Sequence, residues 1–290
     1  MAFDVWSISI IIIKFISYAA TLLSAGSFLF AVILKPDAKL STKSWNILAI
    51  VLAIIASFLL IPLNVGLFND DGFSGMFDFE IFKIVIDSPI GDSTLYRILG
   101  LIILLIGLRF IGILYNFIGA IAVLIIGWSF TQIGHLSNIE PSLIKLLLIL
   151  HLLGVAYWIG AFIPLYRAAN GLLPDNETAD LAHRFGQLAV YIVVGLFIGG
   201  VIMAFNLLAS PSQLFSTVYG RTLGFKILIF FALLGLAALN KLRLVPALKT
   251  SQPNATTRLQ QSIMLESLLV ATIFIITAIL TTVTQLPAQH

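Results

Sequence analysis

YRILGLIILLIGLRFIGILYNFIGAIAVLIIGW, residues 96–128, is apolar almost throughout, and its only charged residues are Arg97 and Arg109. A helix needs about 20 residues to cross a hydrocarbon core about 30 Å thick. This stretch is therefore too long for one membrane span and predicts two, with the break at Arg109 and Gly112. A pair of helices satisfies its backbone polar groups internally, which lipid requires.

The whole chain has the same character. Hydrophobic residues make up 60% of the 290 residues and charged residues 10%, whereas a soluble domain carries about 25% charged residues. The composition predicts an all-α, polytopic membrane protein with the lipid bilayer as its solvent. There is no cysteine, which excludes disulfides, thiolate metal sites and cysteine nucleophiles. No Ser/His/Asp grouping or HExxH motif is present, so we expect no enzyme.

Apolar runs of spanning length predict about eight transmembrane helices. They cover residues 8–34, 44–67, 94–109, 112–134, 142–168, 184–208, 220–240 and 259–284. The first run follows no basic segment, unlike a cleaved signal peptide, and is predicted to be a retained span. No internal repeat or low-complexity linker divides the chain, so residues 1–290 are predicted to form a single integral membrane domain.

Charge alternates between successive connections and predicts the orientation. Every second connection is basic, through Lys35, Lys39, Lys43, Arg109, Arg167, Arg184, Lys241, Arg243, Lys249 and Arg258. By contrast, segment 68–93 holds six acids and one lysine, and 135–141 and 209–219 hold no Lys or Arg. The positive-inside rule then places both termini on the outer, periplasmic side. The small net charge of +3 is a topology signal, and no nucleic-acid partner is expected. A short interfacial or re-entrant helix is expected near 77–86.

Ionisable residues inside predicted spans are the candidate functional residues, because burying them in lipid is costly. Lys14, Arg97 and Lys226 lie within two turns of an outer helix end. Either their long stems carry the charge to the interface, or they face a cavity. Glu266 lies about seven residues into the last span and its stem is too short to do the same. It needs a structural Arg or Lys partner, a proton or a metal ion.

Two histidines stand in or beside apolar spans. His151 lies about nine residues into the fifth predicted span, with Trp158 seven positions later on the same helical face and Gly154 between them. His135 lies near the outer end of the fourth span. The depth difference of roughly 8–9 Å at helical rise favours two successive stations over one shared coordination sphere. A core histidine bonded to a neighbouring hydroxyl, and an interfacial histidine, are the alternatives.

Imidazole suits copper, zinc, iron and nickel, whereas thioether selects Cu(I). Only Met203 and Met264 lie in predicted spans, so a histidine-led copper site is chemically acceptable and a methionine-lined tunnel is poorly supported.

The order of several motifs resembles the copper resistance protein D (CopD/PcoD) family. The motifs are GH (134–135), HLLGVAYWIGAF (151–162), HRFGQLA (183–189), YGRTLGFK (219–226), NKLRLVP (240–246) and LESLL (265–269). The resemblance is strongest over 134–290, and the first half agrees only in span number and general character. The chain departs from the family pattern at Gly160-Ala161, where a Gly-Gly pair is common, and in its LPAQH ending.

This resemblance implies a bacterial inner-membrane protein that takes up copper from the periplasm. The family pattern falls on His135, His151 and Glu266, with Trp158, Tyr219, Arg221 and Lys226 in support. With the two methionines of the spans added, the predicted copper ligands are His135, His151, Glu266, Met203 and Met264. It also implies a separate periplasmic copper donor of the CopC type. Two other functions stay open: a membrane redox protein with histidine-ligated haem, and a copper-sensing or assembly protein that does not transport.

Overall fold

The computed structural model describes residues 4–69, 72–134, 143–208 and 210–284, and these form a bundle of long helices without a strand. Eight helices are long and apolar enough to cross a membrane within the described part of the chain, as the sequence predicts. They are α1 (Val5–Leu34), α2 (Lys43–Asn69), α4 (Pro89–Gly107), α5 (Gly112–Ser129), α6 (Leu143–Gly160), α8 (Asp175–Leu207), α10 (Val218–Leu239) and α12 (Ala255–Leu280).

Shorter helices extend or connect these spans. In chain order they are η1 (Ala38–Leu40), η2 (Phe73–Phe77), α3 (Phe79–Ile86), α7 (Phe162–Arg167), η3 (Ala168–Leu172), α9 (Gln213–Ser216), η4 (Asn240–Leu244) and α11 (Val245–Lys249). The predicted short helix near 77–86 is confirmed as α3. It begins at an N-cap, where the Asp78 carboxylate accepts a hydrogen bond from the Ile81 backbone N–H at 3.0 Å.

Two helices begin at least five residues before their predicted spans. α4 begins at Pro89, five residues before the predicted 94, because the Ser88 hydroxyl accepts from the Ile90 N–H and Pro89 occupies the first turn. α8 begins at Asp175, well before the predicted 184. Asp175 and Glu177 sit in its first turn, where the helix dipole favours acids.

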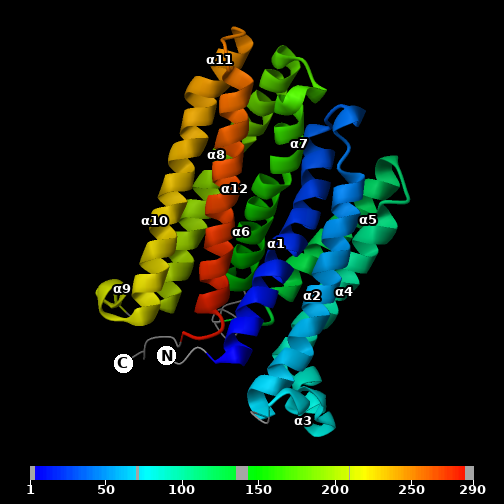
Figure 1. Ribbon diagram of the computed structural model, residues 1–290, viewed down its shortest axis with the longest axis vertical. Coiled ribbons are helices and arrows are strands. Elements are labelled where there is room, and N and C mark those ends of the chain that lie inside the picture. The colour runs from blue at the N-terminus through cyan, green and yellow to red at the C-terminus, as the bar shows by residue number, and fades with distance from the viewer. Residues whose placement is uncertain (1–3, 70–71, 135–142, 209, 285–290) are drawn as a thin grey trace.

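The bundle has two chemically different ends (Figure 1). We call the end that carries α3, α9, the beginning of α1 and the end of α12 the acidic end. The opposite end, with η1, α11 and the turn between α4 and α5, carries the alternate basic connections and is called the basic end. The predicted alternation of basic and acidic connections therefore agrees with an even number of antiparallel crossings.

α1 lies at the centre of the bundle and packs against α2, α6 and α12. Its contact with α6 is very close: a Cβ built on Gly26 would lie 1.9 Å from the Ala156 carbonyl oxygen, and one on Gly160 would lie 2.1 Å from the Gly26 oxygen. Small residues let membrane helices approach in this way. α4 and α5 form the predicted hairpin, which turns at Gly112 with φ of +63°.

The last four spans enclose space between them. α8 packs on α6, and α10 packs on α12. α8 and α10 meet through the rings of Phe197 and Phe231, whose centroids are 6.2 Å apart. A cavity lies between these two helix pairs on one side and α1, α2, α3 and α4 on the other.

Candidate functional site

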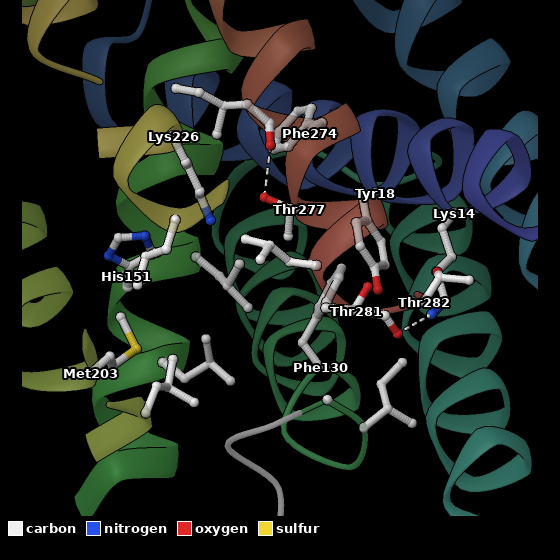
Figure 2. Close-up of a pocket in the computed structure, with 18 of the residues that line it drawn as sticks. Lys14, Tyr18, Phe130, His151, Met203, Lys226, Phe274, Thr277, Thr281 and Thr282 are labelled. Atoms are coloured by element: carbon white, nitrogen blue, oxygen red, sulfur yellow. Dashed lines mark hydrogen bonds between the residues drawn. The ribbon is translucent and has the colours of Figure 1, made fainter. Parts of the chain in front are cut away.

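The cavity has a volume of about 1140 Å³ and runs from the acidic end into the bundle. Phe68, Ser88 and Thr282 line it near the acidic end, and Trp158 lines it at depth. Most of its wall is apolar, which is usual for a ligand pocket with a few placed polar groups. Figure 2 shows two polar sides facing each other: His151, Lys226 and Met203 on one side, Lys14 and Tyr18 on the other.

His151 lies on the cavity wall, eight residues after the start of α6. Its Nδ1 atom is buried and has no hydrogen-bond partner among the described residues. A buried polar atom without a partner costs free energy, so a small change in the imidazole orientation that brought this nitrogen to a ligand in the cavity would be favoured. The core-histidine alternative, with a bond to a neighbouring Ser or Thr, finds no support at this atom.

Gly154 makes room for the neighbouring helix α8 and not for a ligand. A Cβ at this position would lie 3.0 Å from Ile192 and 3.0 Å from Leu196, so the missing side chain lets α8 approach α6. His151 and Trp158 both line the cavity. Between them along α6, side chains of α8 fill the space beside Gly154.

The structure separates the two methionines of the candidate site. Met203 of α8 is 7% exposed and lines the cavity on the same side as His151. Met264 of α12 is 59% exposed and lies outside this cavity. Imidazole nitrogen and thioether sulfur both suit Cu(I), so His151 and Met203 are a chemically acceptable pair of stations, and Met264 does not join them.

Glu266 is held behind the cavity by two neutral donors. The indole Nε1 of Trp158 donates to Oε2 at 3.1 Å, and the side-chain amide of Asn240 donates to Oε1. Glu266 is 4% exposed, and no Lys or Arg pairs with it within the described ranges. The structural ion pair considered from the sequence is therefore absent there, and the carboxylate is left for a proton or a metal ion.

Of the residues predicted to support the site, some line the cavity and one does not. Tyr219 is buried and lines the cavity, and the Lys226 side chain extends into it toward His151 (Figure 2). Arg221 is exposed and is not part of the cavity wall. His135 lies outside the described residues, so the arrangement of His135 and His151 stays a prediction.

The sequence left two interpretations open for Lys14 and Arg97, an interfacial charge or a cavity-facing one. Arg97 is 1% exposed, so the interpretation that its stem carries the charge to the interface is wrong. Its guanidinium bonds to Ser17, Ser93 and Ser129. Lys14 also lines the cavity and donates to the Thr281 carbonyl at 2.8 Å. Ser93 one turn before Arg97 was the only sequence signal, since Ser17 and Ser129 come from other helices.

No cluster of three or more His, Cys, Asp or Glu side chains forms in the part of the chain that the structure describes. A fixed site with a full set of such ligands is therefore not built there. A low-coordinate station, such as His151 with Met203, is what the described donors offer to a metal ion in transit.

Comparison with known families gives two matches. Residues 4–143 match the family described as copper resistance protein D-like, N-terminal domain, and residues 179–280 match copper resistance protein D. The first match extends the likeness into the half of the chain where the sequence showed only general character. No curated protein and no solved structure matches the chain.

Proposed function

Because the chain belongs to the copper resistance protein D family, we propose that it moves copper ions across the membrane through the cavity beside His151. The family connects this multi-pass membrane protein with copper resistance. The observation that carries the proposal is His151 itself: it is part of the cavity wall, and its buried Nδ1 has no hydrogen-bond partner among the described residues.

The charge pattern supports an inward direction. Basic connections favour the cytoplasmic side, so the basic end would face the cytoplasm of a bacterial inner membrane and the acidic end the periplasm. The cavity begins at the acidic end, beside α3 with Asp78 and Glu80. These acids would attract a copper ion or the basic surface of a periplasmic donor of the CopC type.

The proposed path has two parts. From the acidic end, copper would pass Met203 and His151, which line the same side of the cavity. Trp158 ends this part, and Glu266 lies behind its indole. Movement of the Trp158 ring would bring a copper ion to an oxygen ligand, or let Glu266 exchange a proton as copper passes. No step in this path makes or breaks a covalent bond in a substrate, so we propose no enzymatic activity.

Copper uptake into proteoliposomes tests the proposal, with wild-type protein compared with His151→Ala. We expect uptake to fall at least about tenfold, the scale on which losing a group at a metal site acts. His183→Ala is the matched control, because His183 is exposed and lies outside the cavity wall. Unchanged uptake in His151→Ala would overturn the proposed site.

A second function is favoured by one feature: the cavity ends at Trp158. A protein that binds copper from one side and passes the signal to a partner needs no open path. Such a sensing or assembly protein would bind Cu(I) in a His151-dependent manner and show no uptake. Wild-type uptake therefore separates the two functions, and Cu(I) binding by the same two variants shows whether His151 forms the site in either case.

The haem alternative needs two histidines at similar depth. His151 lies toward the acidic end of α6, and His183 lies in the first turns of α8 toward the basic end. These are the two histidines within the described residues, and they do not face each other across a common site. A Soret absorbance band in the purified protein would restore this alternative.

A further inference from the structure

A second buried polar centre lies on the cavity wall around Arg97, beside Tyr18 and Phe130. The guanidinium donates from Nε to the Ser129 hydroxyl at 3.3 Å, from one terminal nitrogen to Ser17 at 3.3 Å and from the other to Ser93 at 3.0 Å. Its carbon lies 4.2 Å from the Phe130 ring centroid and 5.7 Å from that of Tyr18. Three helices and two rings thus hold the group in one orientation.

Arg97 has more hydrogen-bond donors than the described residues accept from. A guanidinium has five N–H groups, and the described residues accept from three of them. All three acceptors are neutral hydroxyls. Two N–H groups therefore lack an acceptor among the described residues, and Arg97, although only 1% exposed, is part of the cavity wall.

Lys14 adds a second charge to the same wall. It lies one helical turn before Tyr18 on α1, and its ammonium donates to the Thr281 carbonyl (Figure 2). An ammonium has three N–H donors, and this is the one bond it makes to a described residue. The Lys14 and Arg97 charges lie close enough to act on each other.

The cavity wall contains cations and no acid among the described residues. Lys14, Arg97 and Lys226 line it, and no Asp or Glu does. The ion pair that the described residues form is Lys249 with Asp180, outside the cavity. Buried charges without a counter-charge are strongly unfavourable, and in membrane proteins they pair with an opposite charge or mark a ligand path.

We propose that the cavity binds an oxyanion, a phosphate group, at Arg97 and Lys14. Arg donates in pairs to the oxygens of phosphate, and Lys serves as a point charge beside it. The ring faces of Phe130 and Tyr18 fix the guanidinium plane, and the serine bonds leave one N–H on each terminal nitrogen for the ligand. The phosphate has two possible sources: inorganic phosphate from the acidic-end solution, or the head group of an anionic phospholipid.

The apolar wall and the α8–α10 side of the cavity suit the lipid source. Phe205 and Phe231 line the cavity and are 68% and 50% exposed, so the wall continues to the outer, lipid-facing surface of the bundle. Acyl chains could lie along this side while the head group reaches Arg97. The inference goes beyond copper movement, although a bound anion would also offset the Lys226 charge that a copper ion meets beside His151.

Binding measured without copper tests the inference. Wild-type protein is placed in nanodiscs of phosphatidylcholine, and equilibrium binding of radiolabelled inorganic phosphate is measured. In a second arm the nanodiscs also contain phosphatidylglycerol, and native mass spectrometry counts the phosphatidylglycerol that stays on the protein. We expect binding in at least one arm, and the arm that shows it identifies the source.

Charge-removing and charge-keeping variants assign the site. Lys14→Gln and Arg97→Gln should each weaken binding at least about tenfold, as expected for loss of a hydrogen bond from a charged donor. Arg97→Lys disturbs the same serine bonds and loses the paired donation but keeps the charge, so it should weaken binding less than Arg97→Gln does. Lys241→Gln is the matched control, since Lys241 also donates to a backbone carbonyl, that of Gly186, but lies outside the cavity.

Two results would overturn the inference: no binding by wild-type protein in either arm, or binding by Lys14→Gln as tight as by wild type. If Arg97→Gln does not fold, Lys14→Gln still decides, because its side chain makes a single bond to the described structure. Copper takes no part in these measurements, so their failure is distinct from failure of the proposed copper path.

Discussion

The indole Nε1 of Trp158 donates a hydrogen bond to Oε2 of Glu266 at 3.1 Å, joining α6 to α12 in the interior of the bundle. Trp158 also lines the cavity, and Glu266 does not. One side chain therefore separates the space open from the acidic end from a buried carboxylate on the way to the basic end. Any ion that crosses by this route must displace that indole.

The substitution Trp158→Phe, which keeps an aromatic ring and removes the donor, measures how much this hydrogen bond contributes to stability. We expect a loss of roughly 1.5–3 kcal/mol in unfolding free energy, the usual value of a hydrogen bond to a charged group. Thermal unfolding in detergent measures it. Trp128→Phe on α5 is the control, because Trp128 is 43% exposed. A double-mutant cycle with Glu266→Gln should show coupling, and additive effects would contradict the assignment.

Glu266→Gln separates binding from movement. The amide keeps the shape but can neither carry the negative charge nor release a proton. We expect copper uptake to fall about tenfold, equivalent to about 1.4 kcal/mol, while Cu(I) binding at His151 is unchanged in a competition titration. Glu177→Gln, at the exposed first turn of α8, should transport as wild type does. Loss of Cu(I) binding in Glu266→Gln would show instead that the carboxylate acts on the cavity site.

Met203→Leu and Met264→Leu make the same chemical change in two environments. The first removes the thioether from the cavity wall, and the second removes it from a surface that is 59% exposed. Because thioether sulfur favours Cu(I), Met203→Leu should weaken Cu(I) binding and Met264→Leu should not. Volume changes little in either, so stability should be nearly unchanged. Equal effects would remove Met203 from the path.

Gly26→Ala tests the contact that positions α6 against α1. The new Cβ would lie 1.9 Å from the Ala156 carbonyl oxygen, and backbone cannot move aside cheaply. Overpacking of this kind costs typically about 1–3 kcal/mol, seen as a lower unfolding temperature in detergent. Gly195→Ala on α8 meets nothing within 4 Å, so it should be neutral or slightly stabilising, because Ala is the better helix former. An unchanged Gly26→Ala protein would contradict the close α1–α6 packing.

The charged residues show which features of the candidate site could be predicted from the sequence. Glu266 stood out as an acid within a span, and its short stem already demanded a partner. The partners themselves, Trp158 and Asn240, lie 108 and 26 positions away, and no periodicity relates such positions. Arg97 stayed undecided for the same reason: a position near a helix end fits interfacial placement and burial equally well, and the serines that bury it come from α1 and α5 as well as its own helix.

The sequence by itself determined the solvent, the number of spans and the alternation of basic and acidic connections. These follow from how much apolar length each segment has and where charge interrupts it, which are properties of neighbouring residues. Only the tertiary structure decided which polar groups share the cavity, that Met203 faces it and Met264 does not, and that Arg97 is buried. Those outcomes depend on the rotation of each helix about its own axis, which contacts between distant segments fix.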